Sequence, residues 1–235
     1  MIIPSDKRIA SRASVGGFRS GSYYAGANPS GPTGSNLMTF FCVFQPERLP
    51  TGTQVLFGRS TLAADGWLFW SSGTSLFTSV RNGVGAFVNN TLVIAPPFVP
   101  TVLIARYNNG TLETWANALT SGASTSGTGY TSVATRTTIG VRDNLLQEAI
   151  DYTVFAAGML DTFDVAATIA TVNGQWQEDL QQGRYLTDPS AGALGANLWY
   201  WDARNAGATW IDRGPNAVSL ARTGAPQLGC SRMVF

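Results

Sequence analysis

Short runs of apolar residues, separated by residues typical of turns, make up most of the chain after residue 36. In residues 37–44 (LMTFFCVF), apolar side chains fall on both faces of an extended chain, which predicts a strand covered on both sides. Further runs, with SSG, RNG and VNN between them, follow at 54–58, 66–71, 75–80 and 91–95. This pattern predicts a series of antiparallel strands.

The next segment predicts a β-hairpin and then a loop. Two strand-forming runs flank an Asn-Asn-Gly turn signal at 108–110. Small residues fill 120–132, which predicts a long loop, and the strand pattern resumes at 137–141 and 150–158.

One helix is predicted at about 162–182. Apolar residues recur there at steps of three and four, which places them in one stripe along a helix: Val165, Ile169, Val172, Trp176 and Leu180. Asp161 or Asp164 can cap its start and Gly183 its end. The Asn-Gly pair at 173–174 weakens the middle, so two short helices remain an alternative, and Trp176 is interpreted as a core residue.

Residues 1–36 are rich in Gly, Ser, Ala and Pro and predict an extended arm, with one short strand near Ser22–Ala25. Such an arm can lie on its own domain or on a neighbouring subunit. Residues 37–235 predict one all-β domain, because many short strands with a single late helix are typical of a two-sheet antiparallel sandwich or jelly roll.

Charged residues are scarce and scattered. They make up 12% of the chain, and the net charge is +1 with no basic run, which argues against nucleic acid and anionic membranes as partners. No apolar stretch approaches the roughly 18 residues that span a membrane, and residues 1–18 lack the apolar core of a secretory signal. We therefore expect a protein made in the cytoplasm, whose uncharged polar surface suits ligand sites or subunit contacts.

The residue types present exclude several kinds of catalytic and metal site. Without histidine, the chain forms neither a Ser-His-Asp triad nor a Cys-His pair. Two cysteines cannot complete a structural zinc site.

Several motifs follow one another in an informative order. They are the hairpin NNGTLETWANAL at 108–119, the strand TTIGVRDN at 137–144, and the strand and helix AIDYTVFAAGMLDTFDVAATIATV at 149–172. Together with the earlier strands, they resemble the laminin-G-like, concanavalin A-like jelly-roll domains of bacteria and phages over about residues 37–175. The closing WIDRGPNAVSLARTGAP at 210–226 is similar to a segment common around such domains. The resemblance implies two curved antiparallel sheets but no single function, because this fold hosts lectins, glycosidases, adhesins and virion proteins.

The resemblance also includes an enzyme branch, the retaining glucanases. These enzymes need two carboxylates about 5 Å apart, and their pattern places acids as Glu-x-Asp-x-Glu on one strand. Here the nearest acids, Glu148 and Asp151, are three residues apart and point to opposite faces of a strand. We therefore predict no enzymatic activity, with a divergent glycosidase that uses Glu148 as a minor alternative.

The resemblance further implies candidate calcium ligands. Lectin and laminin-G sites use loop Asp and Asn side chains with backbone carbonyls, and Asp143 and Asn144 directly follow the IGVR strand. Asp65 and Asp212 are loop acids of the same kind. The alternative for each is a turn-forming role, and no other cofactor is expected.

Two groups of aromatic residues suggest a carbohydrate site. Trp199 and Trp201 point the same way from one strand, about 7 Å apart, while Tyr200 and Asp202 point the other way. Trp115 is predicted on an exposed concave sheet. The candidate carbohydrate-binding residues are Trp115, Trp199, Trp201 and Asp202, although core packing or a subunit contact is the first interpretation of the 199/201 pair.

The run at 66–71 has large apolar side chains on both faces. Trp67 and Phe69 share one face of the strand, and Leu68 and Trp70 share the other. One of the two faces must belong to the core.

Cys42 and Cys230 can form a disulfide if the first and last strands are neighbours, as the jelly roll allows. Production in the cytoplasm argues against it.

These observations favour a non-enzymatic structural or binding protein. The absent secretory signal, the low charge and the arm favour a phage virion subunit, such as a decoration, fibre or tail-associated protein made in the host cytoplasm. Its partners are then other virion subunits or further copies of itself. The alternative is a carbohydrate-binding module or lectin that binds a surface glycan.

Overall fold

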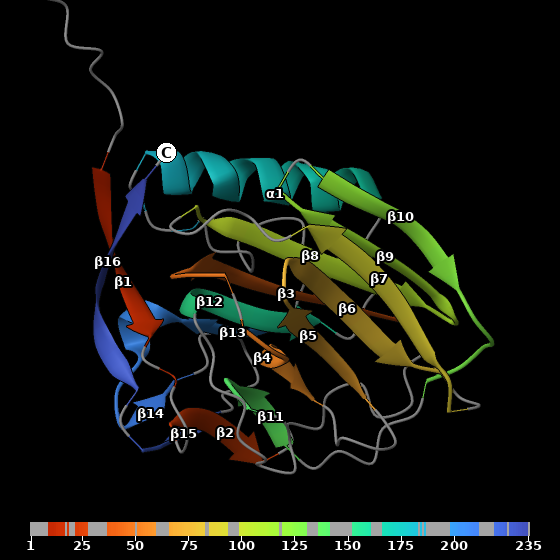
Figure 1. The fold of residues 1–235 in the computed structure, drawn as a ribbon, viewed down its shortest axis with the longest axis horizontal. Helices are drawn as coiled ribbons and strands as arrows, with labels where there is room; N and C mark the ends of the chain where they lie inside the picture. Colours follow the sequence, from red (N-terminus) through yellow and green to blue (C-terminus); the bar gives the residue numbers. More distant parts are fainter. Residues whose placement is uncertain are drawn as a thin grey trace, which may run out of the picture.

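The computed structural model describes residues 9–16, 18, 22–27, 37–49, 51–59, 66–82, 85–93, 99–117, 119–130, 136–141, 152–160, 166–182, 184, 186, 198–211, 219–224 and 226–234. These residues form two antiparallel sheets of eight strands each and one α-helix (Figure 1). The expected all-β, two-sheet antiparallel sandwich with one helix in its second half is confirmed.

The strands of each sheet come from distant parts of the chain. In spatial order, sheet A contains β10 (Leu119–Thr125), β9 (Thr111–Ala116), β8 (Thr101–Asn108), β3 (Leu37–Pro46), β12 (Tyr152–Leu160), β1 (Ile9–Gly16) and β16 (Gln227–Val234), and β13 (Leu198–Asp202) also pairs with β12. Sheet B contains β14 (Thr209–Trp210), β15 (Leu220–Thr223), β2 (Tyr23–Ala27), β11 (Arg136–Ile139), β4 (Gln54–Arg59), β5 (Trp67–Ser72), β6 (Ser75–Arg81) and β7 (Phe87–Val93).

The central strand β3 is buried on both faces, as its sequence predicts. Phe40 and Phe44 belong to the inner core between the sheets, and the Phe40 ring lies 4.5 Å from the Trp67 ring of sheet B. Phe41 and Val43 belong to a second apolar cluster on the outer face of sheet A. Because both faces of β3 are covered, polar and apolar residues do not alternate along this strand.

The second cluster lies beneath α1 (Ala166–Gln181), which runs along the outer face of sheet A (Figure 1). Trp176 and Leu180 from the predicted apolar stripe are buried there, and the Trp176 ring lies 5.0 Å from the Phe41 ring. One continuous helix forms, and not the two short helices of the alternative. In the described part of the chain, no helix is long and apolar enough to cross a membrane.

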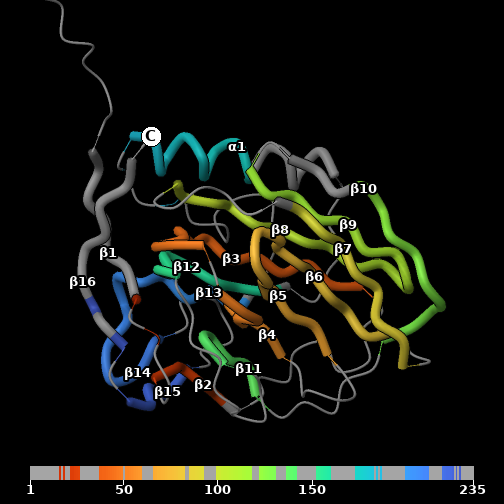
Figure 2. The backbone as a smooth tube through the Cα atoms, in the orientation of Figure 1, coloured from red at the N-terminus to blue at the C-terminus, as the bar shows by residue number. Residues whose placement is uncertain are grey.

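The segment predicted as an arm, residues 1–36, contributes one strand to each sheet. β1 pairs with β16 over eight residue pairs and touches β12 at Val15 and Val154. β2 occupies the position of the expected short strand, and it lies between β15 and β11 in sheet B (Figure 2). The division at residue 37 therefore does not separate two structural units, because backbone pairing with the late strands outweighs a loop-like composition.

The segment predicted as a loop, residues 120–132, begins with the edge strand β10. β10 pairs with β9 across a register shift between Thr120 and Ala123. Its side-chain contacts explain why small polar residues form a strand here: Ser124 Oγ donates to the buried Asn90 of β7. Asn90 thus ties the edges of the two sheets together.

Candidate functional site

The aromatic pair of β13 lies in the inner core. Trp199 and Trp201 are 3% and 0% exposed, and the Trp201 ring lies 6.0 Å from the Phe57 ring of sheet B. Tyr200 belongs to the cluster beneath α1, where its ring lies 6.1 Å from that of Phe41. In this structure neither tryptophan therefore has a ring face open to a sugar.

Trp115 is also buried, contrary to the expectation of an exposed concave sheet. It is 9% exposed and belongs to the cluster beneath α1. The guanidinium of Arg106 lies 5.3 Å from its ring centroid, and Arg106 Nε donates to Glu113 at 2.5 Å. The strand pattern shows which side chains share a face, but not that a helix packs on this face.

Asp202 is a buried structural carboxylate. It is 3% exposed and accepts hydrogen bonds from the Arg204 Nε and backbone N–H, both at 2.9 Å, and from the Tyr200 hydroxyl at 3.1 Å. Burial alone would raise the pKa of Asp202, but these hydrogen bonds and the charge of Arg204 outweigh it and hold the pKa below its ordinary value. These contacts stabilise the turn that follows β13.

The lowered pKa of Asp202 predicts that its contribution to the free energy of unfolding depends on pH. A carboxyl whose pKa is lower in the folded state stabilises the fold above its ordinary pKa of about 4, and this contribution is lost as the pH falls through the folded value. We expect Asp202→Asn to lower the free energy of unfolding by about 1–3 kcal/mol at pH 7, and the loss to shrink below about pH 4. Urea denaturation across pH measures both.

Glu178→Gln is the control for the loss of one negative charge, because the Glu178 side chain is 53% exposed in its ion pair with Arg184. The control should leave stability nearly unchanged at every pH. A loss for Asp202→Asn that is the same at pH 3 and pH 7 would contradict the structural role of the Asp202 carboxylate.

Cys42 does not form the disulfide with Cys230 that the sequence left as a possibility. The Cys42 thiol is free and fully buried. β12 and β1 lie between β3 and β16, so the two backbones are three strand spacings apart, about 14 Å. A disulfide requires Cα atoms within about 7 Å. Burial raises the pKa of the Cys42 thiol, which keeps it protonated.

Several predicted acids and amides lie outside the described residues, namely Asp65, Asp143, Asn144, Glu148, Asp151 and Asp212. Within the described ranges, no group of three or more Asp, Glu, Cys and His side chains is arranged to hold a metal ion.

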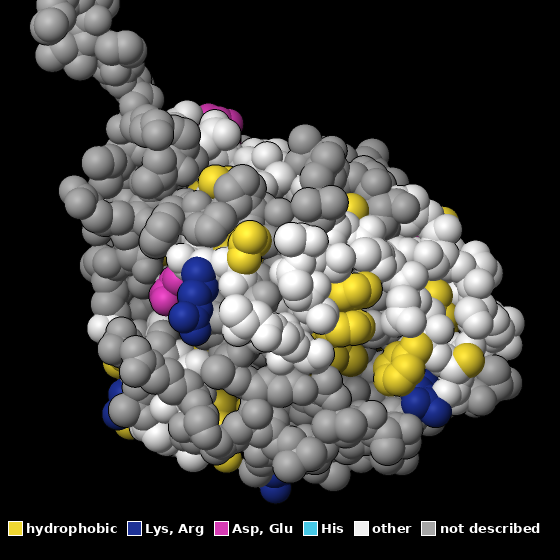
Figure 3. All heavy atoms as spheres, in the orientation of Figure 1, with side chains coloured by type: hydrophobic (Ala, Val, Ile, Leu, Met, Phe, Trp, Pro, Cys, Tyr) yellow, Lys and Arg dark blue, Asp and Glu magenta, His cyan; other side chains and the backbone are white. Residues whose placement is uncertain are grey.

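A half-exposed aromatic surface lies on the outer face of sheet B. Trp67 and Phe69 of β5 belong to the inner core, so the alternate residues of β5, β6 and β7 point outward. Six of these residues define what we call the β5–β7 face: Trp70, Phe77, Ser79, Arg81, Phe87 and Asn89. Figure 3 shows hydrophobic side chains over these strands, with a basic side chain at one end of the patch.

Trp70 and Phe77 form the apolar centre of the β5–β7 face. They are direct cross-strand partners, and their rings stack with centroids 4.0 Å apart and planes 13° apart. Both side chains are half-buried. The stack hides one ring face of each residue and leaves a fixed apolar ridge in contact with solvent.

Polar groups on the neighbouring strands fix this ridge. Trp70 Nε1 donates to Ser79 Oγ at 2.8 Å, and Ser79 Oγ donates to Asn89 Oδ1 at 2.6 Å. Asn89 is exposed, and its Nδ2 has no hydrogen-bond partner among the described residues. The face therefore presents an amide donor beside a rigid aromatic pair.

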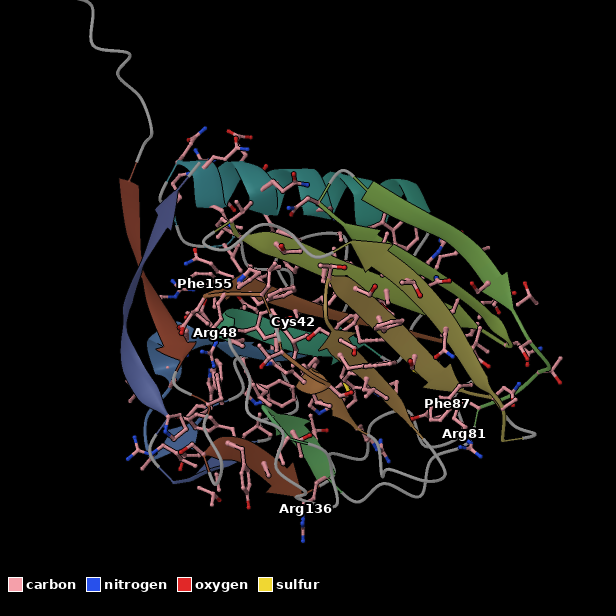
Figure 4. All side chains as sticks on the ribbon, viewed as in Figure 1. Cys42, Arg48, Arg81, Phe87, Arg136 and Phe155 are labelled. Atoms are coloured by element: carbon pink, nitrogen blue, oxygen red, sulfur yellow. The ribbon has the colours of Figure 1, made fainter. Side chains whose placement is uncertain are left out.

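Arg81 and Phe87 form the other end of the face, at the turn between β6 and β7 (Figure 4). The guanidinium carbon lies 4.9 Å from the Phe87 ring centroid. Backbone and side-chain bonds of Asn82 close the turn, at 2.9 Å from Asn82 N to Ala86 O and 2.8 Å from Ala86 N to Asn82 Oδ1. The cation is thus held over an aromatic ring on a closed turn.

One sequence signal for this face was available. From Gly66 to Ala105, Arg81 is the sole charged residue. That stretch contains β5–β7, so its uncharged surface with one cation could have been noticed without coordinates. The sequence alone did not show which face of β5, that of Trp67 or that of Trp70, is buried. The position of β5 in the sandwich was needed for that.

No protein-family model matches the sequence, and no curated protein sequence matches it either. Among solved structures, the chain is similar to a candidate carbohydrate-binding protein of Bacteroides ovatus, with a TM-score of 0.62 and 10% identity over 96% of this chain and 62% of that one. It is also similar to the binding domain of botulinum neurotoxin serotype D, with a TM-score of 0.54 and 8% identity over 72% of this chain and 47% of that one.

A third similar structure is the binding domain of botulinum neurotoxin DC in complex with SialylT, with a TM-score of 0.51 and 6% identity over 71% of this chain and 45% of that one. The chain thus spans less than two thirds of the length of each of these structures. Identities this low show a shared fold, a β-sandwich that also occurs in binding domains.

Proposed function

We propose that this protein is a non-enzymatic binding module whose ligand is a carbohydrate and whose binding surface is the β5–β7 face. The observation that carries the proposal is the stacked, half-exposed pair of Trp70 and Phe77, held in place by Ser79 beside the uncommitted amide of Asn89.

Sugars suit such a surface because a pyranose has an apolar face of C–H groups and a rim of hydroxyls. The apolar face packs on an aromatic ridge, and the hydroxyls accept or donate hydrogen bonds at its border. The Trp70 indole is already fixed by its bond to Ser79, so little conformational entropy is lost on binding.

The similar structures support a binding role. The Bacteroides ovatus protein is a candidate carbohydrate-binding protein, and the two neurotoxin structures are binding domains. Membership of the laminin-G-like, concanavalin A-like family remains part of this proposal and rests on the order of the sequence motifs.

The absence of catalysis is likewise proposed, and the described glutamates support it. Each of them makes structural contacts: Glu47 with Thr153, Glu113 with Arg106, and Glu178 with Arg184 and Gln182. Asp179 lies beside Glu178 on the same arginine, Arg184, which partly neutralises the pair.

Binding is tested by two single substitutions on the ridge. We expect Trp70→Ala and Phe77→Ala each to weaken glycan binding at least about 10-fold, as for a central aromatic residue of an interface. A glycan array identifies a bound glycan, and calorimetric titration of that glycan measures the loss.

Ile211→Ala is the matched control, because Ile211 is 54% exposed and follows β14, away from the face in sequence and pairing. It should leave the affinity unchanged. Full affinity of both ridge variants, or no glycan bound above background by the folded wild type, would end the proposal.

A virion role is the second candidate, and the edge strand β16 favours it. Among the described strands, β16 pairs with β1 alone, and an edge strand offers backbone N–H and C=O groups for addition of a strand from a second copy of the chain. The phage setting and synthesis in a host cytoplasm rest on the resemblance and the low charge. A monodisperse monomer in multi-angle light scattering would contradict self-assembly.

Calcium binding at Asp143 and Asn144 stays a proposal as well. Calorimetric titration of the chelator-treated protein with calcium tests it, with Asp143→Asn as the variant that should lose the heat of binding.

A further inference from the structure

We infer that the glycan bound at the β5–β7 face carries an N-acetylated sugar, whose acetamido group lies beside the free ring face of Phe77 and bonds to Asn89 and Thr91 of β7. This inference rests on the proposed carbohydrate-binding function and adds to it the chemical class of the sugar and the two residues that select it.

The free side of the aromatic stack faces β7. Trp70 stacks on the Phe77 ring from β5, and the cross-strand partner of Trp70 on β4 is Val55, which is 1% exposed. On the side away from Trp70, the partner of Phe77 is the exposed Thr91 of β7. The ring face of Phe77 that the stack leaves free is therefore turned toward β7.

Asn89 and Thr91 are exposed polar residues beside this ring face. They are two residues apart on the outer face of β7, so their backbones are about 7 Å apart. Thr91 is directly opposite Phe77, and Asn89 is diagonal to it at about 7–8 Å, within reach of an aromatic side chain. Among the described residues, neither Asn89 Nδ2 nor the Thr91 hydroxyl has a hydrogen-bond partner, so both are available to a ligand.

The hydrogen bonds that run from Trp70 fix the orientation of the Asn89 amide. The Trp70 indole nitrogen only donates, so Ser79 Oγ accepts from it, and the Ser79 hydroxyl donates onward to Asn89 Oδ1. The 2.6 Å between these two oxygens is typical of an O–H···O bond and short for an N–H···O bond. The Asn89 amide therefore presents only its Nδ2 donors to a ligand, and the bonds behind it polarise these donors.

An acetamido group matches this part of the face with each of its atoms. Its carbonyl oxygen accepts from Asn89 Nδ2, its N–H donates to the Thr91 hydroxyl, and its methyl group packs on the Phe77 ring. The donor and the acceptor of an amide point in opposite directions, as two partners spaced along one strand require. A sugar hydroxyl can also accept from Asn89, but it brings neither the methyl group nor this geometry, so the face selects the N-acetylated sugar.

Three matched pairs of glycans test the inference by calorimetry, and the members of a pair differ in an acetamido group or a hydroxyl at the second carbon of the ring. They are N-acetylgalactosamine and galactose, N-acetyllactosamine and lactose, and triacetylchitotriose and cellotriose. We expect the wild type to bind at least one N-acetylated member about 10-fold or more tightly than its partner, because that member adds two hydrogen bonds and a buried methyl group.

Asn89→Asp should bring the N-acetylated glycan to within about twofold of its partner. Aspartate keeps the oxygen that accepts from Ser79 and replaces the Nδ2 donor with a second acceptor. A sugar hydroxyl can donate to this carboxylate and a carbonyl oxygen cannot, so the affinity for the partner sugar should stay within about twofold of the wild type. Thr91→Val removes the acceptor for the acetamido N–H and should lower the preference about threefold.

Asn205→Asp is the matched control. Asn205 lies in the half-buried turn Ala203–Asn205 that follows β13 of sheet A. The substitution adds the same negative charge away from the β5–β7 face and should keep the full preference.

Several results would overturn the inference. They are equal binding within all three pairs by the wild type, failure of every N-acetylated member to bind, and a preference that survives Asn89→Asp or Thr91→Val. If other glycans on the array bind and depend on Trp70, the proposed function stands and only the N-acetylated ligand is rejected. If no glycan binds above background, both are rejected.

Discussion

Replacing Trp201 with alanine is expected to lower the free energy of unfolding by about 3–5 kcal/mol. The side chain is fully buried and packs across the sandwich against Phe57, so its removal leaves a cavity between the two sheets. Because a domain has about 5–15 kcal/mol of stability in total, this variant should unfold at a much lower urea concentration. Urea denaturation followed by circular dichroism measures the shift.

Trp70→Ala is the matched comparison, a change from tryptophan to alanine at a residue that faces solvent. Trp70 is half-buried and faces solvent, so its loss should cost less than half as much stability while it weakens glycan binding. Equal midpoints for Trp201→Ala and the wild type would show that Trp201 is not a core residue. The contrast also means that loss of binding after a change at Trp201 is not evidence for contact with a sugar.

Gly158→Ala is expected to destabilise the fold by about 3 kcal/mol or more, because there is no room for a single added carbon. Gly158 lies in β12, and a Cβ there would come within 2.2 Å of the Phe41 ring and 2.4 Å of the Trp199 carbonyl oxygen. β13 is fixed by its pairing with β12, so the backbone oxygen cannot move away without loss of that pairing. Expression yield and urea denaturation test this expectation.

Gly174→Ala is the control for a change from glycine to alanine. Gly174 is exposed in the middle of α1, and an added Cβ would meet nothing within 4 Å. Alanine should raise the free energy of unfolding by about 0.5–1 kcal/mol, because it restricts the unfolded chain and favours the helix. Equal effects of the two substitutions would contradict the close packing of β13 on β12.

The parts of the fold that local patterns specify could be predicted from the sequence. The apolar run at 37–44 indicated a strand covered on both faces, and the stripe containing Trp176 and Leu180 indicated a helix with one buried face. Both signals depend on periodicity within a few residues, and both agree with the contacts of Phe41 beneath α1.

The remaining parts of the fold depend on pairing between strands that are distant in the sequence, so local patterns could not predict them. β1 and β2 consist largely of small residues and become strands because β16 and β15 pair with them. Trp115 alternates as an exposed strand residue would, yet α1 and Arg106 cover it. Trp70 and Trp67 both looked suitable for the core, and only the placement of β5 against β3 showed which one faces solvent.

The pairing of β1 with β16 also determines when the protein can finish folding during its synthesis. β1 is made long before its partner strand, residues 227–234, and β12 offers it contact at a single residue pair. Most of β1 must therefore wait, unpaired, until residues 227–234 have left the ribosome. Such high contact order makes folding slow, and the exposed strand needs protection from other chains in the meantime.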